Sequence, residues 1–189
     1  MRRIEYSVAC SLDGYIAGPA GEYDWIIMDP EIDFAAMMGR YDTYLMGRKT
    51  YEMMQGAGGP APAGRVLVFS RTLKPEDHPD VTIVAEDAEE RLRELRAQPG
   101  KDIWLFGGGE LFRSLLELNQ VDALSIAVVP VLLGGGVPLL PSPAARAKLS
   151  LAGHRVYGKS GIVLLEYDVV REATGRSAAK RKRARKAAQ

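Results

Sequence analysis

Short apolar segments alternate with amphipathic segments along most of this chain. The short segments, which are rich in apolar and β-branched side chains and typical of buried strands, are residues 4–10, 44–46, 65–69, 81–85, 103–106 and 123–129. Segments with apolar side chains at helical spacing lie between them, at residues 30–38, 47–54, 87–97 and 110–118. This alternation predicts an α/β domain whose mostly parallel central sheet is flanked by helices on both faces.

The last part of the chain departs from this alternation. Residues 149–157 and 162–170 are joined by Gly158-Lys-Ser-Gly, which predicts a C-terminal antiparallel hairpin at one edge of the sheet. Residues 11–29 and 55–64 are predicted loops rich in Gly or Pro. Long loops in compact domains are often functional, so we expect residues 11–29 to cover a site. The Gly/Pro loop at 133–143 fits two uses, as a cover for the substrate or as a dimer contact.

Two local patterns predict where helices begin. Pro30 is suited to the first turn of its helix. Asp87-Ala-Glu-Glu resembles a capping box, with Asp in the place of Ser or Thr. We therefore expect the Asp87 side chain to cap the helix that follows it.

Composition narrows the class of protein. At 189 residues, with 47% hydrophobic and 26% charged residues, the chain is suited to one globular domain. Its apolar runs are too short to span a bilayer, and its first residues contain no signal-peptide core. Cys10 is the single cysteine, which excludes an internal disulfide and a thiolate metal cluster and favours a role as core filler. His78 and His154 have no metal-ligand spacing, so we expect no metal. The single cysteine and the lack of a signal-peptide core predict a cytoplasmic location.

Charge is distributed unevenly. The chain has 25 basic and 24 acidic residues, but seven of the basic ones lie within residues 176–186, so that residues 1–175 carry a net charge of −6. We therefore divide the chain into a domain at 1–172 and a basic tail at 173–189. The tail contains no aromatic residue for base stacking, which favours a disordered solubilising extension over a segment that contacts nucleic acid or another polyanion.

The strongest local signal for chemistry is Asp-Ile-Trp-Leu-Phe-Gly-Gly-Gly-Glu-Leu-Phe-Arg at 102–113. An apolar strand stops at three glycines, and an amphipathic helix follows at once. Such a junction presents bare backbone N–H groups and the positive end of a helix to a ligand, most often a phosphate. The pattern is not the dinucleotide fingerprint GxGxxG, because no third glycine stands at the required offset.

Two further junctions resemble this one. Gly47-Arg48-Lys49-Thr50 follows the strand at 44–46 and places cations in the first turn of a helix, where an anion would compensate the helix dipole. Ser70 and Arg71 follow the strand at 65–69 and are suited to a 2′-phosphate rather than a ribose hydroxyl. Carboxyl ends of parallel strands meet at one sheet edge, so the junctions together predict a phosphorylated cofactor bound without metal.

Six motifs in order resemble the dihydrofolate-reductase-like superfamily, and within it the reductase domain of the bifunctional riboflavin-biosynthesis deaminase-reductase and its stand-alone bacterial relatives. The resemblance covers residues 3 to about 170. The motifs are Ser-Leu-Asp-Gly-Tyr-Ile-Ala-Gly (11–18), Asp-Trp (24–25), Met-Gly-Arg-Lys-Thr-Tyr-Glu (46–52), Phe-Ser-Arg-Thr-Leu (69–73), Phe-Gly-Gly-Gly-Glu-Leu (106–111) and Leu-Leu-Gly-Gly-Gly-Val-Pro-Leu (132–139).

This resemblance implies an NADPH-dependent reductase that commonly dimerises and acts on a small pterin-, folate- or ribosylaminopyrimidine-like metabolite. It implies a phosphate cradle whose first Gly-Gly bond is often cis. The cofactor would contact Ala9, Ile16 and Ala17 at the nicotinamide, Gly47, Arg48, Lys49 and Thr50 at the phosphates, Ser70 and Arg71 at the 2′-phosphate, and Gly107, Gly108, Gly109, Glu110 and Leu111 at the pyrophosphate.

Two carboxylates are candidates for handling the proton that accompanies hydride transfer. Folate reductases use a carboxylate near the position of Asp33, whereas the riboflavin branch carries the signature that contains Asp13. We favour Asp33, and we expect Trp25 to form a wall of the site. Arg65 resembles the arginine that binds the folate tail, but its spacing to Ser70 is one residue short of the folate pattern.

Two functions from different classes remain. The first is an NADPH-dependent oxidoreductase. The alternative is a non-catalytic nucleotide-binding protein on the same fold, with the basic tail on a polyanion. The intact glycine and Met-Gly-Arg-Lys-Thr motifs favour the enzyme.

Overall fold

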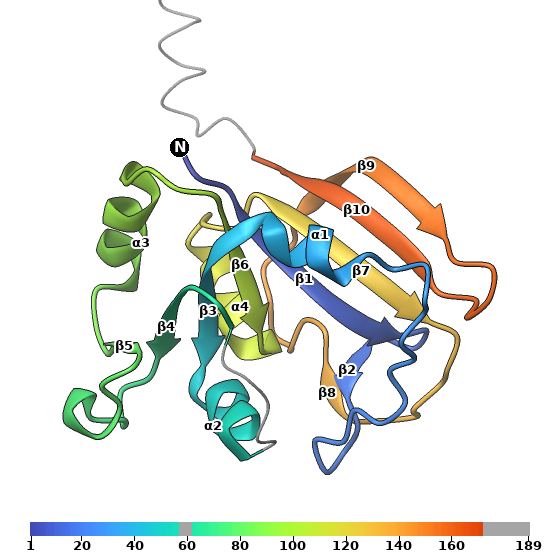
Figure 1. Ribbon diagram of the computed structural model, residues 1–189, viewed down its shortest axis with the longest axis horizontal. Coiled ribbons are helices and arrows are strands. Elements are labelled where there is room, and N and C mark those ends of the chain that lie inside the picture. The colour runs from blue at the N-terminus through green and yellow to red at the C-terminus, as the bar shows by residue number, and fades with distance from the viewer. Residues whose placement is uncertain (57–61, 172–189) are drawn as a thin grey trace, which may run out of the picture.

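An eight-stranded sheet forms the centre of the computed structural model, which describes residues 1–56 and 62–171 (Figure 1). Its strand order is β5-β4-β3-β6-β1-β7-β10-β9, in which neighbouring strands from β5 to β7 are parallel and β10 is antiparallel to both β7 and β9. The predicted parallel sheet and C-terminal hairpin are thus confirmed. The strands are β1 (Ile4–Ser11), β3 (Tyr41–Gly47), β4 (Arg65–Phe69), β5 (Thr82–Val84), β6 (Asp102–Gly107), β7 (Ala123–Val129), β9 (Lys148–Val156) and β10 (Val163–Val170).

Helices pack on both faces of the parallel part of the sheet. On one face, α3 (Ala88–Ala97) and α4 (Gly109–Glu117) cover the largest apolar cluster, where the ring of Tyr6 stacks on that of Phe112 with 4.1 Å between centroids. On the other face, α1 (Phe34–Gly39) and α2 (Arg48–Gly56) pack near a cluster around Tyr44 and Trp104. Burial on both faces explains why the central strands are continuous apolar runs rather than alternating ones.

Two predicted loops contain a short strand each. β2 (Tyr15–Ala17) pairs with β8 (Val137–Pro138) in a separate antiparallel sheet, and the N–H of Leu139 donates to the carbonyl of Gly14 at 2.9 Å. These loops at 11–29 and 133–143 therefore hold each other beside the end of β1 (Figure 1). Strands of two and three residues are too short to produce a periodic hydrophobic pattern, which is why the sequence did not indicate them.

Two predicted boundaries and one predicted helix cap were wrong. The helix expected from residue 30 begins at Phe34, because the Oδ1 of Asp33 accepts the Ala36 N–H at 2.8 Å and caps it there. The strand expected at 44–46 begins at Tyr41, since the polar residues Asp42 and Thr43 interrupt its apolar pattern. Asp87 precedes α3 in the left-handed conformation with φ of 51° and makes no capping side-chain hydrogen bond, so the predicted capping box does not form.

Some of the sequence predictions concern residues that the structure leaves undescribed. The tail at 173–189 lies wholly outside the described residues, and so does the middle of the predicted loop at 55–64. A single 3-10 turn, η1 (Pro75–Asp77), lies between β4 and β5. In residues 1–56 and 62–171, no helix has both the length and the apolar content needed to cross a membrane.

Candidate functional site

A cavity of about 1820 Å³ runs along the carboxyl ends of the parallel strands. It extends from the turn after β4, past the glycines after β6 and the ends of β1 and β7, to the hairpin of β9 and β10. Typical small-molecule pockets occupy about 300–1000 Å³, so this cavity has room for an extended cofactor together with a second ligand. All of the residues that the sequence assigned to a cofactor line it.

The glycine junctions after β3 and β6 meet inside this cavity. Gly107 has a φ of 151°, and the Gly107–Gly108 peptide is cis, as the resemblance implied. A Cβ atom on Gly108 would lie 3.4 Å from the Thr50 hydroxyl, and one on Gly47 would lie 3.9 Å from the Gly107 carbonyl. The absence of these side chains leaves backbone exposed between the first turns of α2 and α4, which fits a phosphate group.

Gly109 serves a different purpose from its two neighbours. A Cβ atom at this position would lie 2.6 Å from the Pro138 carbonyl and 3.0 Å from Cδ of Pro141. The third glycine is therefore required for close packing of α4 against the loop that contains β8. Only the first two glycines of the triplet open onto Thr50 and the cradle.

Cations surround the cradle with little internal compensation. Arg48 has a carboxylate partner in Glu52, at 3.9 Å and exposed to solvent. The side chains of Lys49 and Arg71 line the cavity and make no ion pair or hydrogen bond with residues 1–56 or 62–171. Acidic groups line the same end, at Glu86 and Asp87 after β5. This end can bind an anion, and its charges bear on which cofactor it prefers.

Ser70 shapes the turn that presents Arg71. Its hydroxyl accepts the backbone N–H groups of Thr72 at 3.2 Å and Leu73 at 3.1 Å, and its own N–H donates to the Val84 carbonyl at 3.0 Å. The residue is buried, whereas Arg71 is exposed. The Ser70 and Thr72 hydroxyl oxygens also lie 3.3 Å apart within hydrogen-bond distance, so Ser70 fixes the turn that presents Arg71.

Four small side chains form the floor at the middle of the cavity. Strand register pairs Ser7 with Ser125 and Ala9 with Ala127, so these residues lie on one face of β1 and β7. All four line the cavity. Because Ser and Ala project little above the sheet, they leave a space over the central strands in which a flat ring can lie. The sequence assigned only Ala9 to the site, because the serines look like ordinary breaks in an apolar run.

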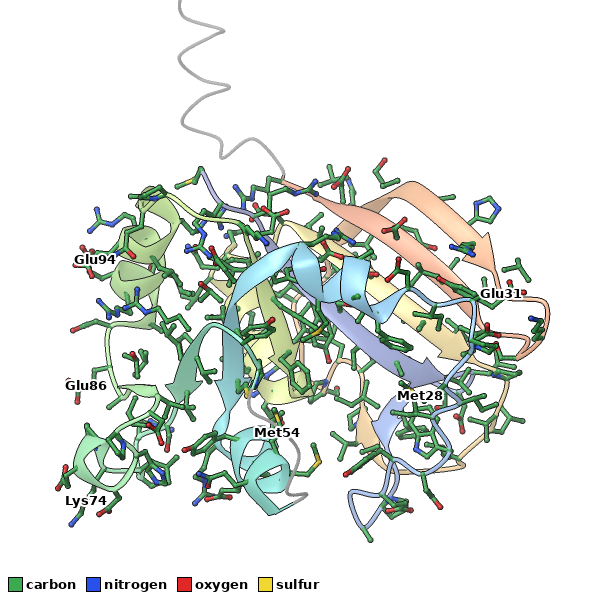
Figure 2. The ribbon with its side chains drawn as sticks, viewed as in Figure 1. Met28, Glu31, Met54, Lys74, Glu86 and Glu94 are labelled. Atoms are coloured by element: carbon green, nitrogen blue, oxygen red, sulfur yellow. The ribbon has the colours of Figure 1, made fainter. Side chains whose placement is uncertain are left out.

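Ile26, Ile27, Met28 and Ile32 also line the cavity, and Asp29 anchors the segment that contains them. The Asp29 carboxylate accepts the N–H of Ser160 at 3.0 Å and that of Glu31 at 2.8 Å. The side-chain hydrogen bond with Ser160, followed by the Glu31 N–H, lowers the pKa of Asp29. Glu31 also pairs with Lys159 at 3.5 Å, and Figure 2 shows Glu31 beside the turn between β9 and β10. No local sequence pattern indicated this anchor, because both of its ends lie in loops.

The two candidate carboxylates lie in different surroundings. Asp33 lines the cavity while capping α1. Asp13 lies outside the lining residues and accepts the N–H groups of Leu133 at 3.1 Å and Gly134 at 2.7 Å. The hydrogen bond from the Ser11 hydroxyl lowers the pKa of Asp13, and the N–H groups of Gly134 and Leu133 lower it further. Asp13 therefore joins the two loops that contain β2 and β8, and Asp33 alone of this pair borders the space above the floor.

Two other predicted residues lie away from the cavity lining. Trp25 packs against the apolar cluster of Val129, Tyr157 and Ile162, and its indole N–H donates to the Glu22 carbonyl at 3.3 Å. Trp25, which the sequence placed in the wall of the site, is thus not itself a lining residue but packs against residues that line the cavity. Arg65 begins β4, at the opposite end from the cavity, and donates to Gln98 at 3.1 Å.

Cys10 lies in the apolar core near the end of β1. Cys10 is 3% exposed, and burial raises the pKa of its thiol to about 11, which suits core filler rather than chemistry. Within the described part of the chain, no group of three His, Cys, Asp or Glu side chains is arranged to hold a metal ion.

Comparison with known proteins agrees with this geometry. Residues 2–163 match the model of the RibD C-terminal domain. The chain is 34% identical over 182 residues to the protein YyaP of Bacillus subtilis (strain 168), which covers 88% of this chain and 94% of YyaP. A Shewanella sp. PV-4 protein assigned to riboflavin biosynthesis superposes with a TM-score of 0.78 and 28% identity, covering 90% of this chain and 100% of that one.

The fold extends to dihydrofolate reductases. The enzyme from Enterococcus faecalis, solved in complex with NADP(H), superposes with a TM-score of 0.65 over 89% of this chain and 97% of that one. Its identity of 18% supports a shared dihydrofolate-reductase-like fold and no more. The family-model match covers most of the sequence and includes every residue that lines the cavity up to Ile162. This chain belongs to the RibD C-terminal domain family.

Proposed function

We propose that this protein is an NADPH-dependent reductase of a small heterocyclic or carbonyl-bearing metabolite of the pterin, folate or ribosylaminopyrimidine kind. The observation that carries the proposal is that one continuous cavity contains both a glycine cradle with cations and a floor of four small side chains. The first part is suited to cofactor phosphates and the second to a stacked pair of flat rings. Membership in a family with reductase neighbours supports the same conclusion.

Each part of the cavity has a role in this reaction. Gly107, Gly108 and Thr50 would hold the pyrophosphate, and Ala9 with Ile16 and Ala17 would border the nicotinamide. When bound, the nicotinamide cofactor supplies the hydride. The small side chains of β1 and β7 hold the two rings in contact, and the segment from Ile26 to Ile32 excludes water from them.

We assign the transfer of the proton to the Asp33 carboxylate. It borders the space above the floor, and its carboxylate can hold a proton for the reduced substrate or orient a water that does so. Its Oδ1 is occupied by the Ala36 N–H, which leaves the second oxygen for the substrate.

Cofactor preference depends on opposing charges. Arg71 favours the 2′-phosphate of NADPH through a charge-assisted hydrogen bond, whereas Glu86 and Asp87 favour a ribose hydroxyl. Ser70 supports the first choice, because its turn presents Arg71 beside the cavity. We expect Arg71 to prevail, since Lys49 and Arg48 add positive charge to the same region.

The experiment that tests the reductase activity follows the loss of nicotinamide absorbance. Purified protein with NADPH is mixed with 7,8-dihydrofolate, with 7,8-dihydrobiopterin and with a ribosylaminopyrimidine. Oxidation of NADPH that depends on one of these compounds supports the proposal. Absence of oxidation with all three, in protein that binds NADPH, would restrict the chain to nucleotide binding.

A further inference from the structure

We propose that Arg155 forms an anion-binding subsite at the far end of the cavity from Arg71, and that the substrate carries a carboxylate or phosphate group that binds there. This inference rests on the proposed function, because it names a chemical feature of that reductase's substrate. Arg155 belongs to β9, in a segment that the sequence indicated only as one strand of a hairpin.

Strand register places Arg155 on the same face as the floor. Arg155 pairs with Leu164 of β10, Leu164 pairs with Ala127 of β7, and Ala127 pairs with Ala9 of β1. Paired residues point to the same side of a sheet, so all four form one row across it. Neighbouring strands are about 4.8 Å apart, which puts the Arg155 backbone about 14 Å from Ala9. This separation leaves room for a small substrate between the expected nicotinamide position and Arg155, which also lines the cavity.

Tyr157 orients the Arg155 guanidinium. The Cζ atom of Arg155 lies 4.6 Å from the centroid of the Tyr157 ring. Tyr157 is itself buried, and its backbone N–H donates to the Ile162 carbonyl at 2.9 Å. A guanidinium that stacks on an aromatic ring keeps the N–H donors at its edge free, and that edge is the part that binds carboxylate or phosphate.

Most arginines in the described part of the chain already have a carboxylate or amide partner. Within residues 1–56 and 62–171, the exceptions are Arg71, Arg146 and Arg155, whose side chains make neither an ion pair nor a hydrogen bond. Two of these three, Arg71 and Arg155, line the cavity, at opposite ends. The first is already assigned to a cofactor phosphate, so the second points to an anionic group on the other ligand.

Neighbouring charges leave Arg155 uncompensated. Arg40 also lines the cavity, but it pairs with Glu5 at 2.6 Å and approaches Glu166 at 4.0 Å. Glu31 pairs with Lys159 on the adjacent turn. The carboxylates on this side thus have cations of their own, and Arg155 is the cation available to an incoming anion.

The test compares matched pairs of ligands on protein saturated with NADP⁺. Calorimetry measures the affinity for pterin-6-carboxylate against pterin, and for uridine 5′-monophosphate against uridine. We expect one anionic member to bind about 10- to 100-fold more tightly than its neutral parent, as a charged hydrogen bond allows. A gain in affinity within the pterin pair indicates that the subsite binds a carboxylate, and a gain within the uridine pair indicates that it binds a phosphate.

Arg155→Gln should abolish that gain and leave the affinity of the neutral parent unchanged, whereas Arg146→Gln, on an exposed arginine outside the cavity lining, should preserve it. Equal binding within both pairs, no binding by either pair, or a gain that survives Arg155→Gln overturns the inference. Binding of NADP⁺ is measured in the same samples. Its failure would count against the proposed function, whereas intact NADP⁺ binding without an anion gain counts against the Arg155 subsite alone.

Discussion

Asp33 combines a structural role with the chemical role that we assign to it. Its Oδ1 caps α1 through the Ala36 N–H, and the residue borders the cavity above the floor of small side chains. Substitution by alanine would remove both roles at once. Asparagine separates them, because its carbonyl oxygen can still accept the capping hydrogen bond while the charge is lost.

Asp33→Asn should therefore lower kcat by about 10²–10⁴-fold with little change in thermal stability. The measurement is steady-state NADPH oxidation with the substrate found in the screen, together with a melting curve. Asp24→Asn, on an exposed residue that does not line the cavity, is the control and should be fully active. Full activity of Asp33→Asn would show that its carboxylate only caps the helix.

Asp13 should make stability depend on pH. Hydrogen bonds from Ser11 and from the N–H groups of Gly134 and Leu133 lower its pKa in the folded protein. Its contribution to stability is thus complete above the unfolded pKa of about 3.9 and is lost as the pH falls through the lower folded value. We expect Asp13→Asn to be less stable than the unchanged protein at pH 7, and we expect the difference to shrink in acid.

Urea unfolding at pH 7 and at pH 3 checks this expectation. A stability difference that stays constant between the two pH values would contradict the role given to the Asp13 carboxylate. The reducing activity at pH 7 should survive in the part of Asp13→Asn that remains folded, because Asp13 does not line the cavity.

The position of a single residue in the site could be predicted from the sequence where its residue type has one dominant use in such a context. Gly107 and Gly108 after an apolar strand, and Arg71 at the end of another, line the cavity as expected. Arg155 and Ser125 were not predictable, because an arginine or a serine within a strand gives no sign of which face it occupies. That information comes from strand register, which depends on partners far away in the sequence.

At the scale of elements, two loops fold as one unit beside the cavity. β2 and β8 pair, Asp13 binds the backbone at Leu133 and Gly134, and Gly136 packs directly against the Ala17 carbonyl. The sequence indicated loops at 11–29 and 133–143 but contained no local signal that they touch. Contacts between such short strands are tertiary, and local periodicity cannot report them.

Gly136→Ala should disrupt this unit. A Cβ atom there would collide with the Ala17 carbonyl, and the φ of 139° is unfavourable for alanine. We expect a loss of about 1–3 kcal/mol in the free energy of unfolding, with weaker cofactor binding, because Ala17 lines the cavity. Gly135→Ala is a matched control, since its added Cβ meets nothing within 4 Å. Equal stability of the two variants in urea would refute this packing argument.

At the scale of the whole molecule, the outer edge of β9 is the surface that we expect to form the homodimer. β9 is an edge strand, and Leu149, Leu151 and Val156 are exposed on it. An exposed apolar edge strand invites pairing with a second copy. The loop at 133–143 is the other candidate surface, with Leu140 partly exposed.

Sedimentation velocity distinguishes the two surfaces. We expect the unchanged protein to sediment as a dimer, Leu151→Glu to sediment as a monomer, and Leu140→Glu to remain a dimer. The reverse result would place the contact at the loop. A monomer in all three samples would contradict dimerisation.

The fold class was predictable from the sequence because it rests on many repeated signals. Alternating strands and helices predict a parallel sheet, and carboxyl-end junctions predict a site at one edge, so the location of the cavity followed from the order of elements. Its extent did not follow. The segment from Ile26 to Ile32 and the β9–β10 turn, which are far apart in the sequence, are connected by the Asp29–Ser160 hydrogen bond and the Glu31–Lys159 ion pair.

The most direct test of the whole account is a calorimetric titration with NADPH and, in parallel, with NADH. We expect one NADPH to bind per chain at least 10-fold more tightly than NADH, because Arg71 gains a charged hydrogen bond only from the 2′-phosphate. Arg71→Gln should abolish that preference. Lys74→Gln, on a cation that Figure 2 shows at the outer end of the molecule and that does not line the cavity, should retain it. Binding of neither nucleotide would contradict the account, and equal binding of both would contradict the role of Arg71.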